Sequence, residues 1–308
     1  MKKVFITGEA GVIPKHLTEI LNLGCDFKVI EYPASMKTHN SFSIRENELD
    51  FTSKHFEDCI RMETPDIIIH SGAYVGTDFC DNSQQAACVS NVFGTKNVVD
   101  ICNKYGIDLI YLSTTAIFDP KHYGPMMPIT EFTKINPQTY YGITKYAGEL
   151  TVVNECKTKW LVVRPVFGFS EFPHDLHSAL TKYIYASINN VDLTILLNKG
   201  TDKSYTHARN IAKTICNLMK DGKWLDTFNI GKNFTQSMNW NEMITIFELF
   251  DIGKGKKINF IPEKDYLHYH NINNAKVSDY FTDDSFVKDI GNVVDSVKQN
   301  KHIKPYWI

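Results

Sequence analysis

Short apolar runs alternate with longer amphipathic segments along the first half of the chain. The apolar runs are nearly continuous rather than alternating with polar residues, as in strands buried on both faces of a parallel sheet. They cover residues 3–7, 27–31, 66–70 and 109–113. Between them, apolar residues recur at helical spacing in segments 11–23, 53–62 and 83–105. Strands that alternate with helices predict right-handed crossovers and a doubly wound parallel sheet, an α/β fold.

The pattern changes after Pro165. Up to that point the alternation continues through a predicted helix at 140–155 and a strand at 160–164. Beyond it, helical segments are mixed with short strands. The helices are predicted at 176–188, 208–219 and 240–249, and the strands at 193–196, 226–230 and 257–261. We therefore predict a larger domain over residues 1–165, with returning segments near 205–235, and a smaller α/β lobe formed mainly by residues 166–308.

Composition excludes several classes of function. The chain has 308 residues, of which 43% are hydrophobic and 22% charged, as in a folded globular protein. Its 33 basic and 35 acidic residues are interspersed, which argues against a nucleic-acid or membrane partner. The apolar run at the N-terminus ends too soon for a signal peptide. The seven cysteines contain no Cys-x-x-Cys pair, so we expect reduced thiols, no metal site and a cytoplasmic location.

A glycine-containing turn joins the first predicted strand to the first helix. In Thr7-Gly8-Glu9-Ala10-Gly11-Val12-Ile13-Pro14, Gly8 permits a tight turn and Gly11 lets the backbone approach a diphosphate at the helix N-terminus. Pro14 stands where a third glycine is expected, and proline fits the first turn of a helix. By itself a Gly-x-x-Gly segment is equally consistent with an ordinary turn.

Glu31 ends the second predicted strand, where an acidic side chain can accept hydrogen bonds from an adenosine ribose. A carboxylate there would repel a 2′-phosphate, so the sequence favours NAD over NADP. The alternative is a solvated charge at a strand end. The turn, the helix and the acid at this spacing together favour nucleotide binding in a Rossmann-type domain.

Tyr141 and Lys145 are four residues apart on the predicted helix 140–155, so they share one face. A lysine ammonium near a phenol favours the phenolate and lowers its pKa from ~10. Tyr-x-x-x-Lys is also a common surface pairing. Here, however, it follows Thr114, whose hydroxyl stands at the carboxyl end of a predicted strand, where parallel sheets bind ligands.

These motifs resemble those of the extended short-chain dehydrogenase/reductase family, the NAD-dependent epimerases, dehydratases and reductases of nucleotide sugars. The resemblance runs over nearly the whole chain. It is carried by Thr7-Gly8-x-x-Gly11-x-Ile13, Asp50-Phe51, His70-Ser71-Gly72-Ala73, Asn91-Val92-x-Gly94-Thr95-x-Asn97, Tyr141-Gly142-x-Thr144-Lys145-x-x-x-Glu149 and Phe228-Asn229-Ile230-Gly231.

The resemblance implies an enzyme in which Tyr141 is the acid/base on a sugar hydroxyl or ketone. Thr114 would bind the reacting oxygen, and Lys145 the nicotinamide ribose, while the cofactor exchanges hydride with the sugar carbon. The implied cofactor-binding residues are Gly8, Gly11, Val12, Ile13, Glu31, Asp50, Phe51, Gly72, Ala73 and Lys145. The implied substrate-binding residues are Tyr74, Thr115, Phe167 and Lys203.

Departures from the family pattern narrow the reaction. The 4,6-dehydratases carry Asp-Glu after the threonine, whereas this chain has Thr115 and Ala116, so elimination of water is not expected. The segment from Ser113 to Asp119, and Ala73-Tyr74, look closer to the dTDP-4-dehydrorhamnose reductases. Glu31 and the motif from Asn91 to Thr95 fit a C4 epimerase equally well. Both reactions stay open.

The second half departs further from the family. Segment 164–168 is shorter than its family counterpart, and Lys203 replaces an arginine on the diphosphate, keeping the charge but losing bidentate geometry. With Pro14, these differences leave open a non-catalytic, nucleotide-binding regulatory relative. The resemblance also implies a nucleotide-sugar substrate and a homodimer formed through helices 83–105 and 140–155.

Overall fold

The computed structural model describes residues 1–9, 11–30, 51–119, 127–166, 168–172, 178–196, 202–253, 258–261 and 272–300. The chain forms two compact units. Unit 1 comprises Met1–Asp119, Glu131–Pro165 and Ala212–Ile230, and unit 2 comprises Pro120–Thr130, Val166–Ile211 and Gly231–Ile308.

Unit 1 is built on a six-stranded, entirely parallel sheet in the order β2-β1-β3-β4-β5-β9. Its strands are β1 (Lys2–Thr7), β2 (Phe27–Ile30), β3 (Ile67–His70), β4 (Asp108–Leu112), β5 (Trp160–Pro165) and β9 (Asp226–Ile230). Because β1 lies between β2 and β3, the winding reverses there, and the ends of β1 and β3 are neighbours in register at Thr7 and His70. The predicted doubly wound sheet is confirmed. In sheets of this kind, ligands bind at such a switch point.

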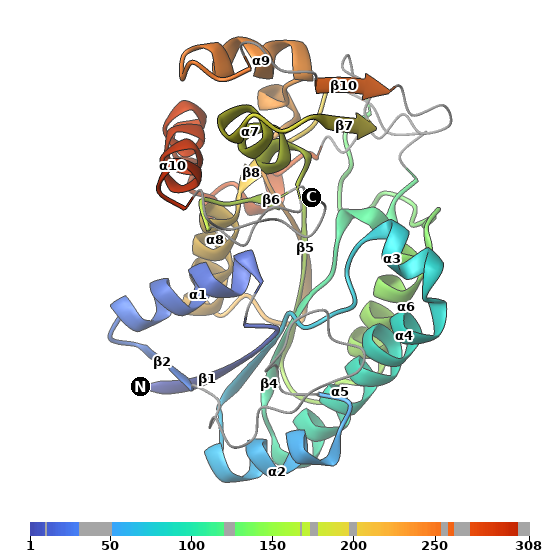
Figure 1. Cartoon of the computed structure of the whole chain (residues 1–308). Coiled ribbons are helices and arrows are strands. Elements are labelled where there is room, and N and C mark those ends of the chain that lie inside the picture. The colour runs from blue at the N-terminus through green and yellow to red at the C-terminus, as the bar shows by residue number, and fades with distance from the viewer. Residues whose placement is uncertain are drawn as a thin grey trace. The chain divides into compact units, whose positions relative to one another are not determined.

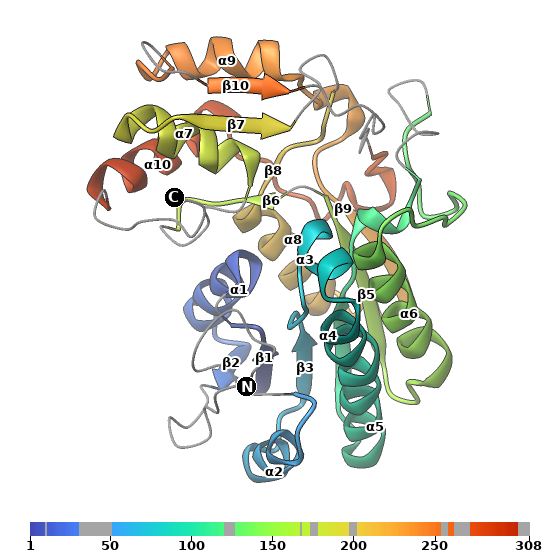
Figure 2. The same ribbon diagram turned by 45° about the vertical axis from the view of Figure 1, so that its right-hand side comes forward.

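Helices cover both faces of this sheet. Figures 1 and 2 show α1 (Val12–Leu23) on one face and α2 (Lys54–Glu63), α5 (Thr95–Tyr105) and α6 (Tyr140–Glu155) on the other. On the second face, apolar side chains of the strands and of α2 and α5 form one buried cluster. Helix α8 (Ala208–Lys220) begins in unit 2 and ends in unit 1.

The long helix predicted at 83–105 is interrupted. It consists of α4 (Gln84–Cys88), the π-helical turn η2 (Val89–Gly94) and α5. A further short helix, α3 (Thr77–Asn82), precedes it and was not predicted. Its six residues, Thr-Asp-Phe-Cys-Asp-Asn, are too few and too polar to show a helical period. Both departures lie beside the candidate site described below.

Unit 2 combines helices with two small parallel sheets. One pairs β7 (Leu193–Leu196) with β10 (Ile258–Ile261), and the other pairs β6 (Gly168–Phe169) with β8 (Thr206–His207). The helices are α7 (Ala179–Asn189), α9 (Trp240–Glu248) and α10 (Phe286–Gln299) with short turns η4 (Phe234–Gln236) and η5 (Ala275–Val277). Their core is aromatic, with Tyr183 stacked on Phe247 at 4.8 Å between ring centroids. The sequence did not predict α10.

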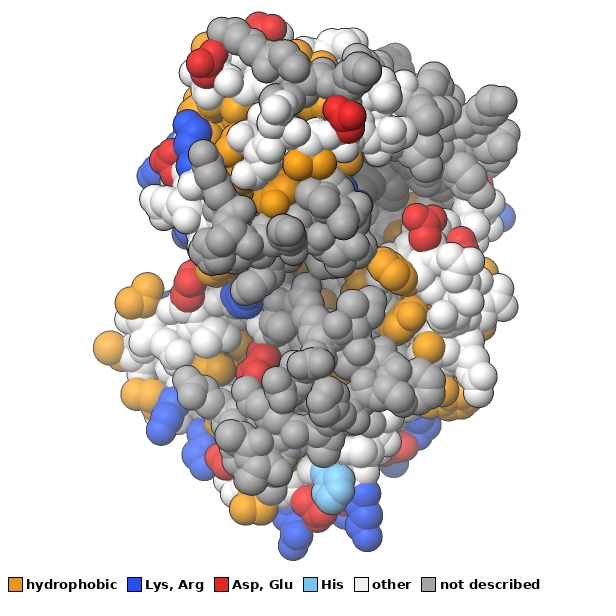
Figure 3. Space-filling model, in the orientation of Figure 1, with side chains coloured by type: hydrophobic (Ala, Val, Ile, Leu, Met, Phe, Trp, Pro, Cys, Tyr) orange, Lys and Arg blue, Asp and Glu red, His pale blue; other side chains and the backbone are white. Residues whose placement is uncertain are grey.

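Several large apolar side chains remain exposed on the α3–α6 side of unit 1. Ile143, Leu150 and Val153 on α6 are 49%, 43% and 39% exposed, and Phe93 on η2 is 65% exposed. Figure 3 shows hydrophobic side chains on the visible surface over α3, α4 and α6. Exposed patches of this kind commonly mark contact surfaces.

Across the described part of the chain, no helix combines the length and the apolar character needed to cross a bilayer.

Candidate active site

At the switch point, backbone approaches backbone because two glycines lack side chains. Gly8 has φ +67, and a Cβ added there would lie 2.7 Å from the Gly72 Cα. A Cβ on Gly72 would lie 2.5 Å from the ring of Phe51. The Gly11 amide donates to the Gly8 carbonyl at 2.9 Å, which closes the turn. Any residue larger than glycine at positions 8 and 72 would fill this cradle.

Helix α1 begins at this turn. Gly11 is its N-cap, Val12 and Ile13 start the helix, and Pro14 lies buried in its first turn, where its missing N–H leaves no donor unpaired. The first turn contains no acidic residue and Gly11 makes no side-chain cap. The positive end of the helix is therefore left for an anion, which suits a diphosphate.

Phe51 lies against the switch point from the side of α2. Its ring meets the His70 ring edge-on at 4.9 Å, and its carbonyl accepts a hydrogen bond from Asn97 Nδ2 at 2.8 Å. A Cβ on Gly94 would also lie 2.5 Å from this ring. Gly72 and Gly94 thus leave room for the Phe51 ring, and Asn97 holds its backbone. Glu31 and Asp50, the other predicted adenosine contacts, lie outside the described residues.

A buried polar chain supports the turn from below. Thr7 Oγ1 accepts the amides of Ser71 and Gly72 at 3.1 and 2.9 Å, so its own proton goes to His70 Nδ1 at 2.8 Å. His70 Nε2 therefore carries the ring proton and donates to Thr95 Oγ1 at 3.2 Å. Burial lowers the pKa of His70 to about 3. His70 is neutral and holds one tautomer.

Asn91, on η2, connects the loop after β3 with α6. Its Oδ1 accepts the Tyr74 amide at 2.7 Å, and its Nδ2 donates to the Tyr74 carbonyl and to Thr144 Oγ1, each at 3.0 Å. The Thr144 hydroxyl donates to the carbonyl of Tyr141. Asn91 was assigned no site role in the sequence analysis, although an asparagine on the apolar side of a predicted helix is a signal of a buried polar contact.

Tyr141 lies in the first turn of α6, and its phenol is near enough to the Thr114 hydroxyl for that group to influence its pKa. The turn is secured by Thr139, whose hydroxyl accepts the Gly142 amide, and by Asp81 of α3, which accepts the Tyr140 amide at 3.1 Å. The sequence predicted a lowered pKa for this phenol. Burial instead raises the pKa of Tyr141 to about 12, while the nearby Thr114 hydroxyl acts in the opposite direction.

Lys145 lies one turn further along α6 and is 2% exposed. Its ammonium lies over the ring of Tyr111, 4.2 Å from the centroid. Burial lowers the pKa of Lys145 to about 7, whereas the charges of Glu149 and of an ionised Cys80 would raise it. Cys80 of α3 also influences Tyr141, so α3 lies close to both members of the predicted pair.

A buried ion pair anchors the other end of the site. The Glu149 carboxylate accepts Ser113 Oγ at 2.7 Å and Arg164 Nε at 3.1 Å, and Arg164 Nη2 bonds its second oxygen. The guanidinium lies over the Phe118 ring, 5.4 Å from its centroid. Glu149 therefore joins α6 to β5 and to the residue preceding Thr114.

The predicted substrate-binding residues divide between the units. In unit 1, Tyr74 follows the Gly72 cradle and Ala73, which is a predicted cofactor contact. Thr115 is buried in η3 (Thr115–Ile117) with its hydroxyl 3.5 Å from the Pro165 carbonyl. Lys203 belongs to unit 2, where its backbone pairs with Met238. Phe167 lies outside the described residues. The structure brings Thr114, Tyr141 and Lys145 together beside the predicted cofactor cradle.

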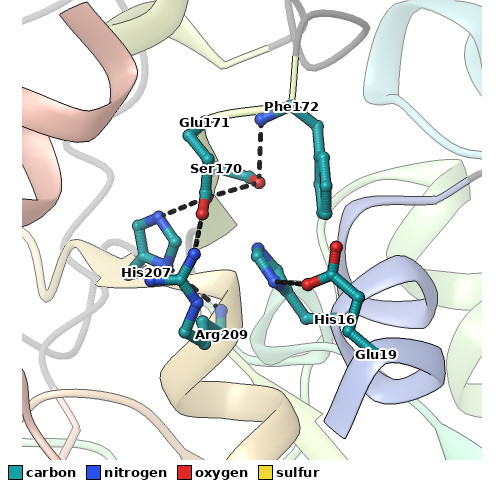
Figure 4. Close-up of polar contacts among 7 residues, drawn as sticks. All are labelled: His16, Glu19, Ser170, Glu171, Phe172, His207 and Arg209. Carbon is teal, nitrogen blue, oxygen red and sulfur yellow. Dashed lines mark hydrogen bonds and ion pairs between the residues drawn. The ribbon is translucent and has the colours of Figure 1, made fainter. Parts of the chain in front are cut away.

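Two smaller polar groups were not predicted. In unit 2, the carboxylate of Glu171 lies between His207, with Nε2 at 2.9 Å, and the guanidinium of Arg209 (Figure 4). In unit 1, His16 Nδ1 lies 3.4 Å from Glu19 one turn along α1. His207 and His16 are fully buried. Neither was predicted, because each stands alone in the pattern of polar and apolar residues.

Comparison with known proteins defines the class. Residues 1–269 match the RmlD substrate-binding domain family. The chain belongs to this family, and thereby to the extended short-chain dehydrogenases/reductases, which confirms the resemblance drawn from the motifs.

Particular relatives are distant. The chain is 24% identical over 263 residues to a Methanocaldococcus jannaschii protein named "Putative UDP-glucose 4-epimerase", covering 82% of this chain and 81% of the relative. It is 23% identical over 270 residues to the dTDP-D-glucose 4,6-dehydratase of Dictyostelium discoideum, covering 76% of this chain and 59% of that protein. It therefore spans less than two thirds of the second relative.

Solved structures share the fold. UDP-glucuronic acid 4-epimerase from Bacillus cereus, in complex with UDP-glucuronic acid and NAD, has a TM-score of 0.79 at 20% identity, covering 96% of this chain and 99% of the other. RMD from Pseudomonas aeruginosa, complexed with NADPH, has a TM-score of 0.78 at 16% identity, covering 97% and 100%.

Proposed function

We propose that this chain is an NAD(P)-dependent enzyme that oxidises or reduces a nucleotide-linked sugar at C4, as an epimerase or a 4-ketosugar reductase. The observation that carries the proposal is that Thr114 lies near the Tyr141 phenol, with Lys145 buried one turn along the same helix. The names of the relatives, which include an epimerase and a dehydratase of nucleotide sugars, support the substrate class.

The residues of unit 1 fit a dinucleotide. Gly8, Gly11 and Gly72 leave room for a diphosphate at the N-terminus of α1, and Phe51 offers a ring beside it. The nicotinamide cofactor would supply the hydride chemistry. We favour NAD because of Glu31, and NADP remains the alternative, since related folds were solved with each.

Tyr141 is assigned the proton transfer. With its pKa raised to about 12, the phenol is protonated at neutral pH and can donate to a sugar carbonyl oxygen while Thr114 binds the same oxygen. The reverse transfer needs a stabilised phenolate, which a charged Lys145 favours. In a reductase, Tyr141 would only donate its proton to the sugar oxygen. In an epimerase, it would both donate and accept a proton during one turnover.

Cofactor exchange separates the two reactions. An epimerase regenerates its own cofactor and can hold NAD tightly through many turnovers, whereas a reductase must exchange NAD(P)H for each sugar it reduces. A stoichiometric NAD that survives gel filtration favours the epimerase. Full exchange with added NAD(P)H favours the reductase.

Substitution of Tyr141 tests the proposal. Tyr141→Phe keeps the ring and removes the proton donor, so we expect turnover to fall about 100- to 10,000-fold while cofactor affinity is unchanged. Turnover is measured on whichever of UDP-glucose, UDP-glucuronic acid and dTDP-4-keto-rhamnose the wild type accepts. Tyr140→Phe is the matched control, because the neighbouring phenol contacts Cys88 instead. Wild-type turnover in Tyr141→Phe would refute the assignment.

A further inference from the structure

Tyr111 is a buried tyrosine of β4 with contacts to two parts of Lys145. Its ring lies beneath the ammonium, 4.2 Å from Nζ to the centroid. Its hydroxyl donates to the Lys145 carbonyl at 3.1 Å. Because burial raises the pKa of the Tyr111 phenol, this hydroxyl keeps its proton and remains a donor. One side chain thus contacts both the backbone and the charge of the lysine.

The fold makes room for this arrangement. In the sheet, Tyr111 is the register partner of His70 on β3 and of Val162 on β5, so its position is fixed from both sides. On α6, Gly148 faces the phenol, and a Cβ there would lie 2.4 Å from the Tyr111 hydroxyl oxygen. Gly148 is three residues after Lys145, so the same helix face supplies both the lysine and the space for the ring.

We propose that Tyr111 is a positioning residue for Lys145, holding its ammonium in place and in the charged form through a cation–π contact. The inference rests on the proposed function, since it assigns a support to a lysine that we place in the catalytic machinery. The face of an aromatic ring attracts a cation, most strongly where water is excluded. The Tyr111 ring replaces part of the hydration that the ammonium loses because Lys145 is only 2% exposed.

Other groups also face Lys145. Glu149 on α6 is anionic and stabilises the charge, and Cys80 on α3 would do so only if ionised, which its own raised pKa of about 12 opposes. His70 on β3 is neutral and adds no repulsion at neutral pH. Against these, burial lowers the pKa of the lysine to about 7. Loss of the ring should lower it by about one further unit, a tenfold change in proton affinity.

A purely structural role makes a different prediction. Tyr111 also belongs to the apolar cluster beneath the sheet, so any substitution that leaves a gap will reduce stability. Only the cation–π contact requires that the pKa of Lys145 follow the presence of the ring. Tyr111→Phe keeps the ring and removes the hydroxyl, whereas Tyr111→Leu and Tyr111→Met fill the space without a ring.

The test is an NMR titration of protein labelled with ¹³C at lysine Cε. The Lys145 signal is identified by its absence in Lys145→Met. We expect a midpoint near 7 in the wild type, the same within about 0.3 units in Tyr111→Phe, and a midpoint about one unit lower in Tyr111→Leu. Tyr111→Met provides the same comparison if the leucine variant does not fold.

An unchanged midpoint in both ring-free variants would overturn the inference, as would an equal shift in Tyr111→Phe. Neither result bears on Tyr141. Conversely, wild-type turnover in Tyr141→Phe would remove the proposed function while leaving a ring-dependent titration intact.

Discussion

At the scale of single residues, the buried histidine beneath the cofactor cradle predicts how stability depends on pH. The pKa of His70 is about 3 in the folded chain and 6.5 without burial. Between these values the unfolded chain binds more protons than the folded one, so the free energy of unfolding falls as the pH drops below about 6.5. The stabilising contribution is fully present only above the unfolded pKa.

Replacing His70 removes this dependence. Between pH 6.5 and 4.5 we expect the wild type to lose about 2 kcal/mol more unfolding free energy than His70→Asn. Urea unfolding at the two pH values measures the difference. His55→Asn, at an exposed histidine of α2, should lose as much as the wild type. Equal losses in wild type and His70→Asn would show that His70 is not buried in its neutral form.

Single residues also show what the sequence could reveal of the site. Gly8 and Gly11, and Tyr141 and Lys145, stand at spacings that local geometry explains, and Thr114 stands at a predicted strand end, so the sequence predicts roles for all five. His70, Tyr111 and Asn91 lie within apolar runs and look like core positions. His70 and Tyr111 come together near Lys145 through the lateral register of β3 and β4, and register between strands far apart in sequence leaves no local signal. Asn91 reaches α6 through a side-chain hydrogen bond to Thr144, which also leaves no local signal.

At the scale of elements, strands and long helices were predicted within one or two residues at most ends. Strand β9 and helix α6 have the predicted bounds. The failures were α3, η2 and α10, and the first two have a common cause. The polar side chains of Asp81 and Asn91 bond backbone groups of other elements, so tertiary hydrogen bonds shape this stretch rather than its apolar period.

The anchoring of α6 gives an element-scale prediction. Arg164→Met leaves the Glu149 carboxylate buried without its partner, so we expect a loss of about 3 kcal/mol or more in unfolding free energy. Adding Glu149→Leu should restore most of it, because the uncompensated charge is then gone. The exposed pair of Lys104 and Glu57 serves as control, and Lys104→Met should cost much less unfolding free energy, because water screens an exposed pair.

The measurement is urea unfolding of the wild type, Arg164→Met, the double variant with Glu149→Leu, and Lys104→Met. If Arg164→Met were no less stable than Lys104→Met, the buried pair would not be what holds α6 to β5. If the double variant stayed as unstable as the single one, the loss would come from packing against Phe118 rather than from charge.

At the scale of the whole molecule, the exposed apolar side chains on α6 and η2 predict self-association. These are Ile143, Leu150, Val153 and Phe93. We propose a homodimer through this face, as expected from the family resemblance. Leu150→Glu should shift the protein to monomer in light scattering at about 10 μM, since a buried carboxylate would oppose the contact. Val287→Glu on α10, at 42% exposure close to the 43% of Leu150, should stay dimeric. A monomeric wild type would contradict the proposal.

The two units differ in how many of the predicted site residues they contain. In unit 1, the described residues include the glycine cradle, the polar chain beneath it and the Thr114–Tyr141–Lys145 group. Unit 2 contains Lys203, for which the family resemblance implies a contact with the substrate, and that role stays a prediction. Spacing along the sequence predicts the chemistry of the first unit, whereas substrate contacts vary with loop length and escape such rules.

The most direct test of the whole account is the binding of nicotinamide cofactor by the purified full-length chain. Bound nucleotide is first identified by mass spectrometry after denaturation, and NADH and NADPH are then titrated by fluorescence. We expect one NAD(P)(H) per chain, with NADH bound more tightly than NADPH. A chain that neither carries nor binds either cofactor would contradict the proposed enzyme and leave a non-catalytic relative of the same fold.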